Sequence, residues 1–471
     1  MLNVIIRKEV MTMFNLGIYV ITLCLMGFLI LSLILRQNKL SNLIVFSLPL
    51  GICPNLLLYF FLDKLSIQYN CFILYASFVV CLIILIICII RKKICLINDV
   101  KKIPVYFIVI LLFIFIKLFF ASYTSYFDWS NWDEFSGWQV SPKIAVISES
   151  YEKIGYKKVM QAPLMIVNAS MVYEISGITI NQVRVFSPIY LVLTALFLYF
   201  ALIKLNINRH VSSLLMLIFL TSAPEMLILA KTYYNNIICM FYTITGFWLI
   251  IYYLFFKEEI KNCMILPAIL LSLAVLTRNE IFYLALAFFV VIFTLMKMFN
   301  DKKRERLILP FVIILVVQII WNLFLRSYKF DIYNLIIITK EDFFSRFSPE
   351  SLRSFLSNVQ AQMFDTTGFY IFSMTYIFIV ALIGLIYIVM RQKNKHNVVN
   401  YKFKFLTLIS ILILQILYLC LILATQFIVF QNFEYLLAAS FSRYMLLVLP
   451  LSFISLGVII QTIVYENKGE L

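Results

Sequence analysis

The sequence predicts an all-α, polytopic integral membrane protein, from two features of its composition and one of its pattern. Of 471 residues, 63% are hydrophobic and only 13% are charged, and the mean hydropathy is +0.99. Soluble domains average about 45–50% apolar and about 25% charged residues. A water-soluble core cannot absorb this much apolar surface, so lipid must surround most of the chain. The apolar residues also fall in runs of about 20, the length of a helix that crosses a bilayer.

About thirteen runs have the length and composition of a transmembrane helix, and the second is interrupted at Pro54. We expect one membrane domain over residues 1–471, because the chain shows no internal repeat, low-complexity linker or separate soluble segment. The expected spans are residues 12–35, 41–61, 68–90, 103–121, 183–203, 209–229, 235–256, 262–277, 281–299, 307–325, 368–390, 403–427 and 442–464.

The formal net charge of +16 would favour a nucleic-acid partner in a soluble protein, but here it serves orientation. Most basic residues lie in short loops that fall on one side of the expected topology, which the positive-inside rule makes cytoplasmic. These loops are residues 91–102, 204–209, 257–261, 302–306 and 391–404. We therefore expect membrane lipids as partners, and no nucleic acid. The long loops 122–182 and 326–367 and the shorter 428–441 then share the outer face of the cell membrane.

Both long outer loops contain sequences that favour surface helices. In the first, Pro142 follows Ser141 as an N1 proline follows a helix cap. In the second, Ser348 and Pro349 open the segment SPESLRSFLSNVQAQMF in the same way. Its apolar residues recur at helical spacing, at Leu352, Phe355, Leu356, Val359 and Met363. Such a helix lies on the membrane surface or over a cavity, with its apolar side down.

Ionisable residues are scarce within the spans and gather near their outer ends. Lys117, Glu225 and Glu280 lie there, together with three cations considered below, Lys231, Arg278 and Arg443. An ion-coupled transporter places its ionisable groups near the bilayer midplane instead. The two histidines, His210 and His396, fall in expected cytoplasmic loops. Acid–base chemistry on the outer face must therefore use carboxylates.

The stretch DWSNWDEFSGW, residues 128–138, begins the first long outer loop. It places Asp128, Asp133 and Glu134 among tryptophans that include Trp132 and Trp138. One interpretation is an interfacial aromatic belt with ordinary loop acids. The other is an active site, because a chain with few acids pairs two directly after a span, beside aromatic faces on which sugar rings can stack. We favour the active site.

In this arrangement the chain resembles the GT-C superfamily of polytopic glycosyltransferases, which includes protein O-mannosyltransferases, aminoarabinose transferases and bacterial envelope polysaccharide glycosyltransferases. The acidic pair after a span carries the resemblance. LAVLTRNEIFYLALA, residues 273–287, resembles the family's span–Arg–x–Glu–span turn, and FSRYMLLVLPL, residues 441–451, resembles its Arg-Tyr opening of a late span. The resemblance begins near residue 103, so the spans within 1–102 are additional. KTYYNN, residues 231–236, lacks the aspartate that many relatives have there.

The resemblance implies transfer of a sugar, with inversion, from a polyprenyl-phosphate donor to a glycan or lipid acceptor on the outer face. Asp133 would be the general base, because an attacking hydroxyl must lose a proton. Glu134 would orient Asp133, bind acceptor hydroxyls or hold a divalent cation with it. Oxygen ligands suit Mg²⁺ or Mn²⁺, but several relatives work without metal, so a cofactor stays open.

The donor phosphate gains negative charge as it leaves, and Arg is suited to paired hydrogen bonds with phosphate. Arg278 and Arg443 are the first candidates for this contact, followed by Lys231 and Arg184; snorkelling at the interface is the alternative for each. Trp132, Trp138 and Asp128 would contact sugar or acceptor, with a purely structural role as the alternative for Asp128. The loop 326–367 would close over both substrates.

Two other functions stay open. A polymerase or ligase that uses a lipid-diphosphate donor would depend on outer-face arginines more than on an acidic pair. A non-enzymatic flippase or transporter would need buried polar residues along a path through the bilayer.

Overall fold

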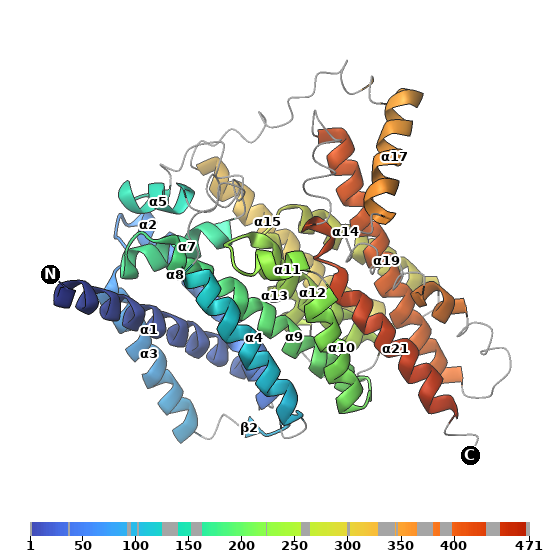
Figure 1. The fold of residues 1–471 in the computed structure, drawn as a ribbon, viewed down its shortest axis with the longest axis horizontal. Coiled ribbons are helices and arrows are strands. Elements are labelled where there is room, and N and C mark those ends of the chain that lie inside the picture. Colours follow the sequence, from blue (N-terminus) through green and yellow to red (C-terminus); the bar gives the residue numbers. More distant parts are fainter. Residues whose placement is uncertain are drawn as a thin grey trace.

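The computed structural model is a bundle of helices with one small pair of strands (Figure 1). It describes residues 2–35, 38–91, 96–100, 103–124, 140–151, 163–222, 224–255, 264–298, 302–327, 344, 347–364, 380–386, 398–429 and 443–467. The elements before the first long loop are α1 Leu2–Ile34, β1 Asn38–Lys39, α2 Leu40–Lys64, α3 Cys71–Ile90, β2 Leu96–Ile97 and α4 Val105–Thr124. The next are α5 Val140–Ile147, α7 Pro163–Ser176, α8 Ile180–Arg184, α9 Phe186–Lys204, α10 Arg209–Ser222, α11 Pro224–Leu229 and α12 Asn235–Phe255. The last are α13 Ile265–Val275, α14 Glu280–Met298, the 3₁₀ helix η5 Lys302–Leu307, α15 Ile308–Ser327, α17 Pro349–Phe364, α19 Val398–Val429 and α21 Leu449–Asn467.

The described part of the chain contains nine helices that are long and apolar enough to cross a membrane. Three shorter apolar helices, Arg209–Thr221, Ile265–Val275 and Leu449–Ile463, correspond to further expected spans. Most of the expected span 368–390 lies outside the described residues, so the number thirteen stays a prediction. The α-helical polytopic membrane architecture itself is confirmed.

Two expected spans are shorter than the sequence indicated, and a third contains a residue that the structure does not describe. The run 209–229 is helical as α10 up to Ser222 and as α11 from Pro224, and residue 223 lies outside the described residues. The run 262–277 forms only the short α13 and then turns at 276–279. In the run 442–464, a short helical segment at 443–445 is followed by turns at 446–448, and α21 starts at Leu449, next to Pro450. These breaks place loops at the helix ends, and two of the loops belong to the site described below.

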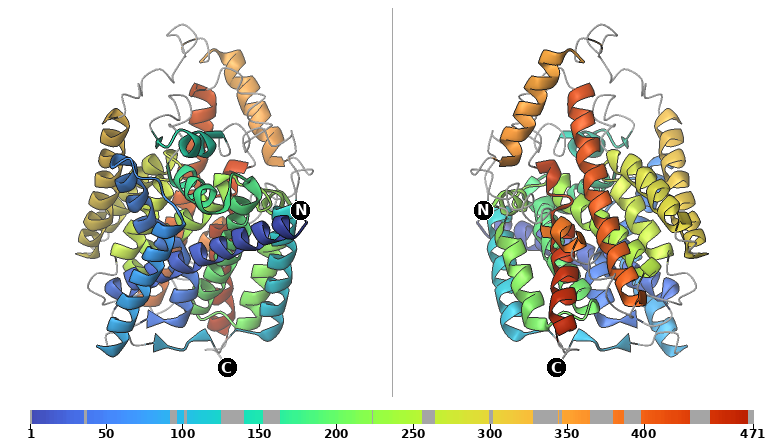
Figure 2. Two further views of the ribbon diagram at one scale, coloured as in Figure 1. Left: turned by 90° about the vertical axis from the view of Figure 1, so that its left-hand side faces the viewer. Right: turned by 90° about the vertical axis from the view of Figure 1, so that its right-hand side faces the viewer.

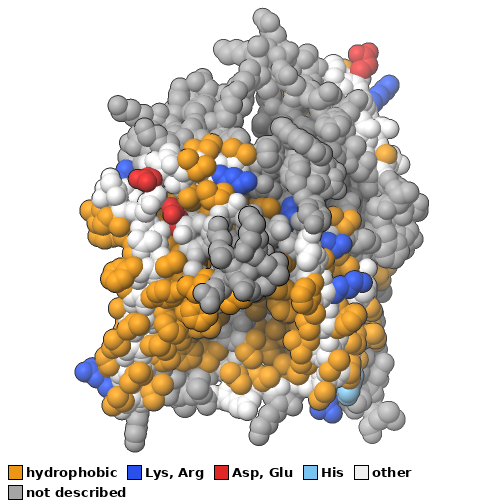
Figure 3. Space-filling model, turned by 60° about the vertical axis from the view of Figure 1, so that its left-hand side comes forward, with side chains coloured by type: hydrophobic (Ala, Val, Ile, Leu, Met, Phe, Trp, Pro, Cys, Tyr) orange, Lys and Arg blue, Asp and Glu red, His pale blue; other side chains and the backbone are white. Residues whose placement is uncertain are grey.

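The bundle has a buried centre and an apolar outer surface, as expected when lipid is the solvent. In α12, 94% of the most apolar window is buried by other helices, whereas in α3 the buried share is 11%. The large exposed residues of α3 are isoleucines, valines and a phenylalanine, which lipid can cover. Hydrophobic side chains extend across the middle and lower part of the face in Figure 3, and the Asp and Glu side chains seen there lie in its upper part.

Two ends of the bundle are defined by contacts between segments far apart in the sequence. At one end, called the β end, β1 pairs with β2, so the loops after α1 and α3 meet (Figure 2). At the other end, called the α7 end, the backbone N–H of Tyr151 donates to Asp63 Oδ1 at 2.9 Å, and the ring of Tyr151 packs on Phe60 and Phe324. The ends of α2 and α15 and the segment after α5 therefore lie together, in agreement with the sidedness expected for these loops.

The helices α1 and α2 cross in close backbone contact. A Cβ added to Gly27 would lie 1.7 Å from the carbonyl oxygen of Ser47, and one added to Gly51 would lie 1.8 Å from that of Leu23. Small residues at such crossings let helix backbones approach and pack within lipid. This crossing holds α2 in place against α1. The end of α2 in turn contacts Tyr151 at the α7 end.

The helix expected in the second long loop is present as α17, and its position on a membrane surface stays a prediction. The backbone N–H of Ser351 donates to Ser348 Oγ at 3.2 Å, so Ser348 caps a helix that begins at Pro349. Phe355 and Val359 are buried, and Phe355 packs on Phe427 of α19. The expected Ser141 cap is wrong, because α5 already begins at Val140 and contains Ser141.

Candidate anion-binding site at the α7 end

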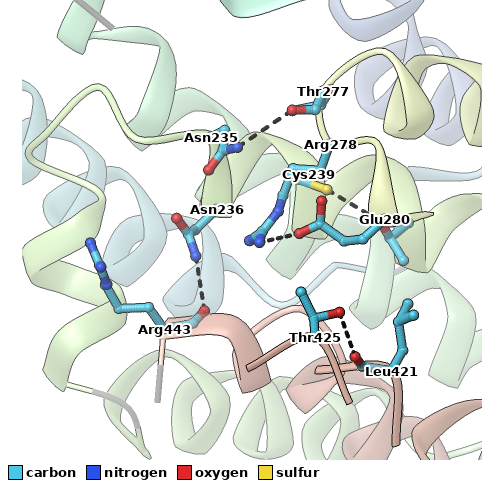
Figure 4. Close-up of polar contacts among 10 residues, drawn as sticks. Asn235, Asn236, Cys239, Thr277, Arg278, Glu280, Leu421, Thr425 and Arg443 are labelled. Atoms are coloured by element: carbon cyan, nitrogen blue, oxygen red, sulfur yellow. Dashed lines mark hydrogen bonds and ion pairs between the residues drawn. The ribbon is translucent and has the colours of Figure 1, made fainter. Parts of the chain in front are cut away.

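Three loops that are far apart in the sequence meet in Figure 4, and the backbone N–H of Leu164 at the start of α7 donates to the carbonyl of Leu276 in one of them at 3.0 Å, so they lie at the α7 end. They are residues 231–234 before α12, residues 276–279 between α13 and α14, and residues 443–448 before α21. Asn235 Nδ2 donates to the carbonyl of Thr277 at 3.4 Å, and Asn236 Nδ2 donates to the carbonyl of Arg443 at 2.9 Å. The first turn of α12 thus holds the other two loops in place.

The 276–279 loop forms where α13 ends after three turns. The backbone N–H of Arg278 still donates to the carbonyl of Ala274, and Thr277 Oγ1 donates to the carbonyl of Leu273. Glu280 then begins α14, where a carboxylate is favoured by the helix dipole. The chain therefore reverses direction within four residues, and the side chain of Arg278 points into the bundle.

Arg278 is buried, with 6% of its surface exposed, and its surroundings are specific. Its Nη2 forms an ion pair with Glu280 Oε1, and its Cζ lies 4.3 Å from the ring centroid of Tyr444. Burial lowers the pKa of Arg278, but Glu280 together with Tyr418, Tyr444 and Cys239 raises it, and the net change in the pKa is upward. The guanidinium therefore stays charged, although its Nη1 has no hydrogen-bond partner among the described residues.

Arg443 lies on the neighbouring loop and is only partly buried. Its Cζ lies 5.5 Å from the ring centroid of Tyr234, which precedes α12. Each of the two arginines thus stacks on a tyrosine that another of the three loops provides. Such cation–π contacts hold a guanidinium by its face.

The structure places the other two candidate cations on different elements. Lys231 is exposed at the start of the first loop, next to Ala230, whose carbonyl accepts a hydrogen bond from Ser122 of α4 at 3.3 Å. Arg184 is buried, with 1% of its surface exposed, on α8, which packs against α4, α7 and α9. Lys231 therefore shares a loop with Tyr234, while Arg184 belongs to a separate part of the α7 end.

The residues expected to act on the sugar lie outside the described residues. These are Asp128, Trp132, Asp133, Glu134 and Trp138. The described residues stop at Thr124, two residues after Ser122, and resume at Val140 in α5, which packs on α7. The segment that contains the acidic pair therefore leaves and re-enters the bundle at the α7 end.

A network of neutral polar side chains that the sequence did not indicate lies inside the bundle. Tyr19 Oη donates to Asn168 Oδ1 at 3.0 Å and accepts from Asn55 Nδ2 at 2.8 Å. Asn168 Nδ2 donates to Tyr233 Oη at 3.4 Å, and Tyr233 donates to the carbonyl of Met165. Through Tyr233, the network joins α1, α2 and α7 to the 231–234 loop. Tyrosine and asparagine carry no charge, so a search for ionisable residues in the spans overlooks them.

Glu174 of α7 is a second group that the sequence did not single out. Partial burial and, to a smaller extent, the charge of Glu149 raise its pKa to about 7. A search for adjacent acids in the sequence could not find this electrostatic interaction, because Glu149 and Glu174 are 25 residues apart.

The described residues contain no group of three or more His, Cys, Asp and Glu side chains that could hold a metal ion. The expected ligands Asp133 and Glu134 lie outside the described residues, so a site for Mg²⁺ or Mn²⁺ stays a prediction. No family model, curated protein or solved structure matches the chain. The geometry of the three loops is therefore the basis for a functional proposal.

Proposed function

We propose that the protein is a membrane glycosyltransferase that moves a sugar from a polyprenyl-phosphate donor to a glycan or lipid acceptor at the outer face of the cell membrane. The observation that supports this proposal is the meeting of Arg278, Arg443 and Lys231 on loops at one end of the bundle. The chain that contains Asp133 and Glu134 leaves and re-enters at the same end. The general base Asp133 and the cations that bind the donor phosphate can then act on the same bound substrates.

In the proposed reaction the acceptor hydroxyl gives its proton to the carboxylate of Asp133 as its oxygen attacks the anomeric carbon. The bond between that carbon and the phosphate oxygen breaks, and its electron pair stays on the phosphate. Arg443 and Arg278 stabilise the charge that develops there. Glu134 orients Asp133, and Trp132 and Trp138 present aromatic faces to the sugar.

The membrane position of the site suits a lipid-linked donor. The site lies at the ends of α12, α14 and α21, whose apolar residues are surrounded by the bundle or by lipid. A polyprenyl chain can remain in the bilayer while its phosphate reaches cations at the end of the helices. A soluble nucleotide-sugar donor would not need a site in this position.

A polymerase or ligase with a lipid-diphosphate donor is the second candidate, and the stacked arginines favour it. The two enzymes differ in their need for a base. The buried polar network of Tyr19, Asn55 and Asn168 is the kind of feature that a flippase would need. Its amides and hydroxyls bond to one another, which equally suits helix packing.

The test uses the full chain in lipid nanodiscs with radiolabelled polyprenyl-phosphate sugars and a membrane extract as acceptor. Release of polyprenyl phosphate and labelling of the extract are measured together. Asp133→Asn should lower transfer roughly 100-fold or more, the usual contribution of a general base. Arg91→Gln, which changes an exposed arginine at the β end, should transfer at the wild-type rate. Wild-type transfer by Asp133→Asn would exclude the base and favour the ligase, whereas no transfer by the unmodified chain would favour the flippase.

A further inference from the structure

Two buried hydrogen-bond donors in the described residues lack a partner and lie in the same cluster. One is Nη1 of Arg278, and the other is the hydroxyl of Tyr418 on α19, whose side chain is completely buried. The two groups interact electrostatically with each other and with Glu280 and Tyr444. A buried polar atom without a partner costs about 1–3 kcal/mol, so two in one cluster call for an explanation.

The other groups of the cluster are already engaged. Glu280 takes the Nη2 edge of Arg278, and Tyr444 covers a face of the guanidinium. Cys239 Sγ lies 3.6 Å from Thr243 Oγ1, its neighbour on α12. The ion pair with Glu280 therefore fixes the guanidinium while its second nitrogen stays available.

The chemistry of the two free groups limits what can bind them. Arginine can only donate hydrogen bonds, so a ligand shared with it must accept. Both groups are buried among helices, where a bond to a charged oxygen is strong. Because Glu280 neutralises Arg278, the net attraction for an anion must also come from Arg443 and Lys231 at the same end.

We propose that Tyr418 and Arg278 together bind a phosphate group, with the tyrosine hydroxyl and Nη1 donating to its oxygens. This inference rests on the proposed function for the identity of the ligand as a donor phosphate. It adds to that function a residue, Tyr418, that lies within a long apolar helix. Tyr418 lies one turn before Leu421 and two turns before Thr425, the α19 residues drawn near Glu280 in Figure 4. Phosphate bound there is on the bilayer side of the Arg278 loop, where a lipid phosphate enters.

The test measures binding to the full chain in detergent by the rise in melting temperature. The probes are undecaprenyl phosphate, inorganic phosphate and undecaprenol. Tyr418→Phe keeps the ring and removes only the hydroxyl, so without ligand it should melt at or above the wild-type temperature. Tyr69→Phe is the matched control, because Tyr69 is also buried with an unpartnered hydroxyl but lies between α2 and α3.

Tyr418→Phe should weaken binding of undecaprenyl phosphate about tenfold or more, the usual effect of losing a hydrogen bond to a charged group. Tyr69→Phe should bind as wild type does, and Arg278→Lys, which cannot keep both the Glu280 pair and a second donor edge, should weaken binding further. If inorganic phosphate binds as the lipid does, the ligand is free phosphate; if only the lipid binds, the ligand is lipid-linked. Equal affinity of Tyr418→Phe and wild type would overturn the inference even if sugar transfer occurs. If Tyr418→Phe binds undecaprenyl phosphate more weakly but the wild-type chain transfers no sugar, the phosphate site is supported and the proposed function is rejected.

Discussion

Replacement of Gly27 by alanine should destabilise the protein strongly, although it adds a single methyl group. The added Cβ would lie 1.7 Å from the carbonyl oxygen of Ser47 and 2.7 Å from the backbone nitrogen of Gly51. Ordinary contacts begin at 3.4 Å, and both neighbours are backbone atoms that cannot rotate away. The helices α1 and α2 must then separate along a long interface. Overpacking of a tight core typically costs about 1–3 kcal/mol, and we expect the upper part of this range.

Gly17→Ala is the matched control, because Gly17 lies on the same helix and has no atom within 4 Å of its added Cβ. Alanine forms helix more readily than glycine by about 1 kcal/mol, so this variant should melt at or above the wild-type temperature. The assay is thermal unfolding of the full chain in detergent, followed by intrinsic fluorescence and by size-exclusion chromatography. Equal melting temperatures for Gly27→Ala and Gly17→Ala would refute the close crossing.

The remaining predictions concern the α7 end. Glu280→Gln should lower stability by about 3 kcal/mol, because it leaves the buried Arg278 without its counter-charge, and the additional change Arg278→Met should recover much of the loss in thermal unfolding. Tyr151→Ala should release the segment after α5 from the ends of α2 and α15, seen as faster hydrogen exchange there with unchanged exchange at the β end. Burial and the charge of Glu149 raise the folded pKa of Glu174 to about 7, so the folded state holds a proton that the unfolded state has lost. This contribution is present at low pH and is lost as pH rises towards and through 7; Glu174→Gln should therefore raise the melting temperature at pH 8 and change it little at pH 5.

The membrane class and most helix positions could be predicted, because a run of about 20 apolar residues is the length that a helix needs to cross a bilayer. α2, α4, α12 and α14 each begin and end within a few residues of the expected spans. The break before Pro450 was harder to predict, since a proline in an apolar run can bend a helix or begin a new one. The close crossing of α1 and α2 could not be predicted from one sequence, because it depends on which faces meet.

The candidate site could be predicted only as separate motifs. The positions of Arg278 and Arg443 near helix ends follow from span boundaries, and the structure brings their loops together through Asn235 and Asn236. The partners Tyr234 and Tyr444 could not be identified as such, because stacking depends on the tertiary arrangement. Tyr418 could not be distinguished from the other tyrosines in apolar helices until its neighbours were known.

The central claim is that Asp133 and Arg443 act in one site, the first on the acceptor proton and the second on the departing phosphate. It is tested by the rate of sugar transfer in a single turnover, measured for Asp133→Asn, Arg443→Gln and the double variant. Groups that act as a unit give strongly non-additive losses. The account predicts that each single variant is slowed at least tenfold and that the double variant is little slower than the worse single one. Wild-type transfer by either single variant, or losses that multiply in the double variant, would contradict it.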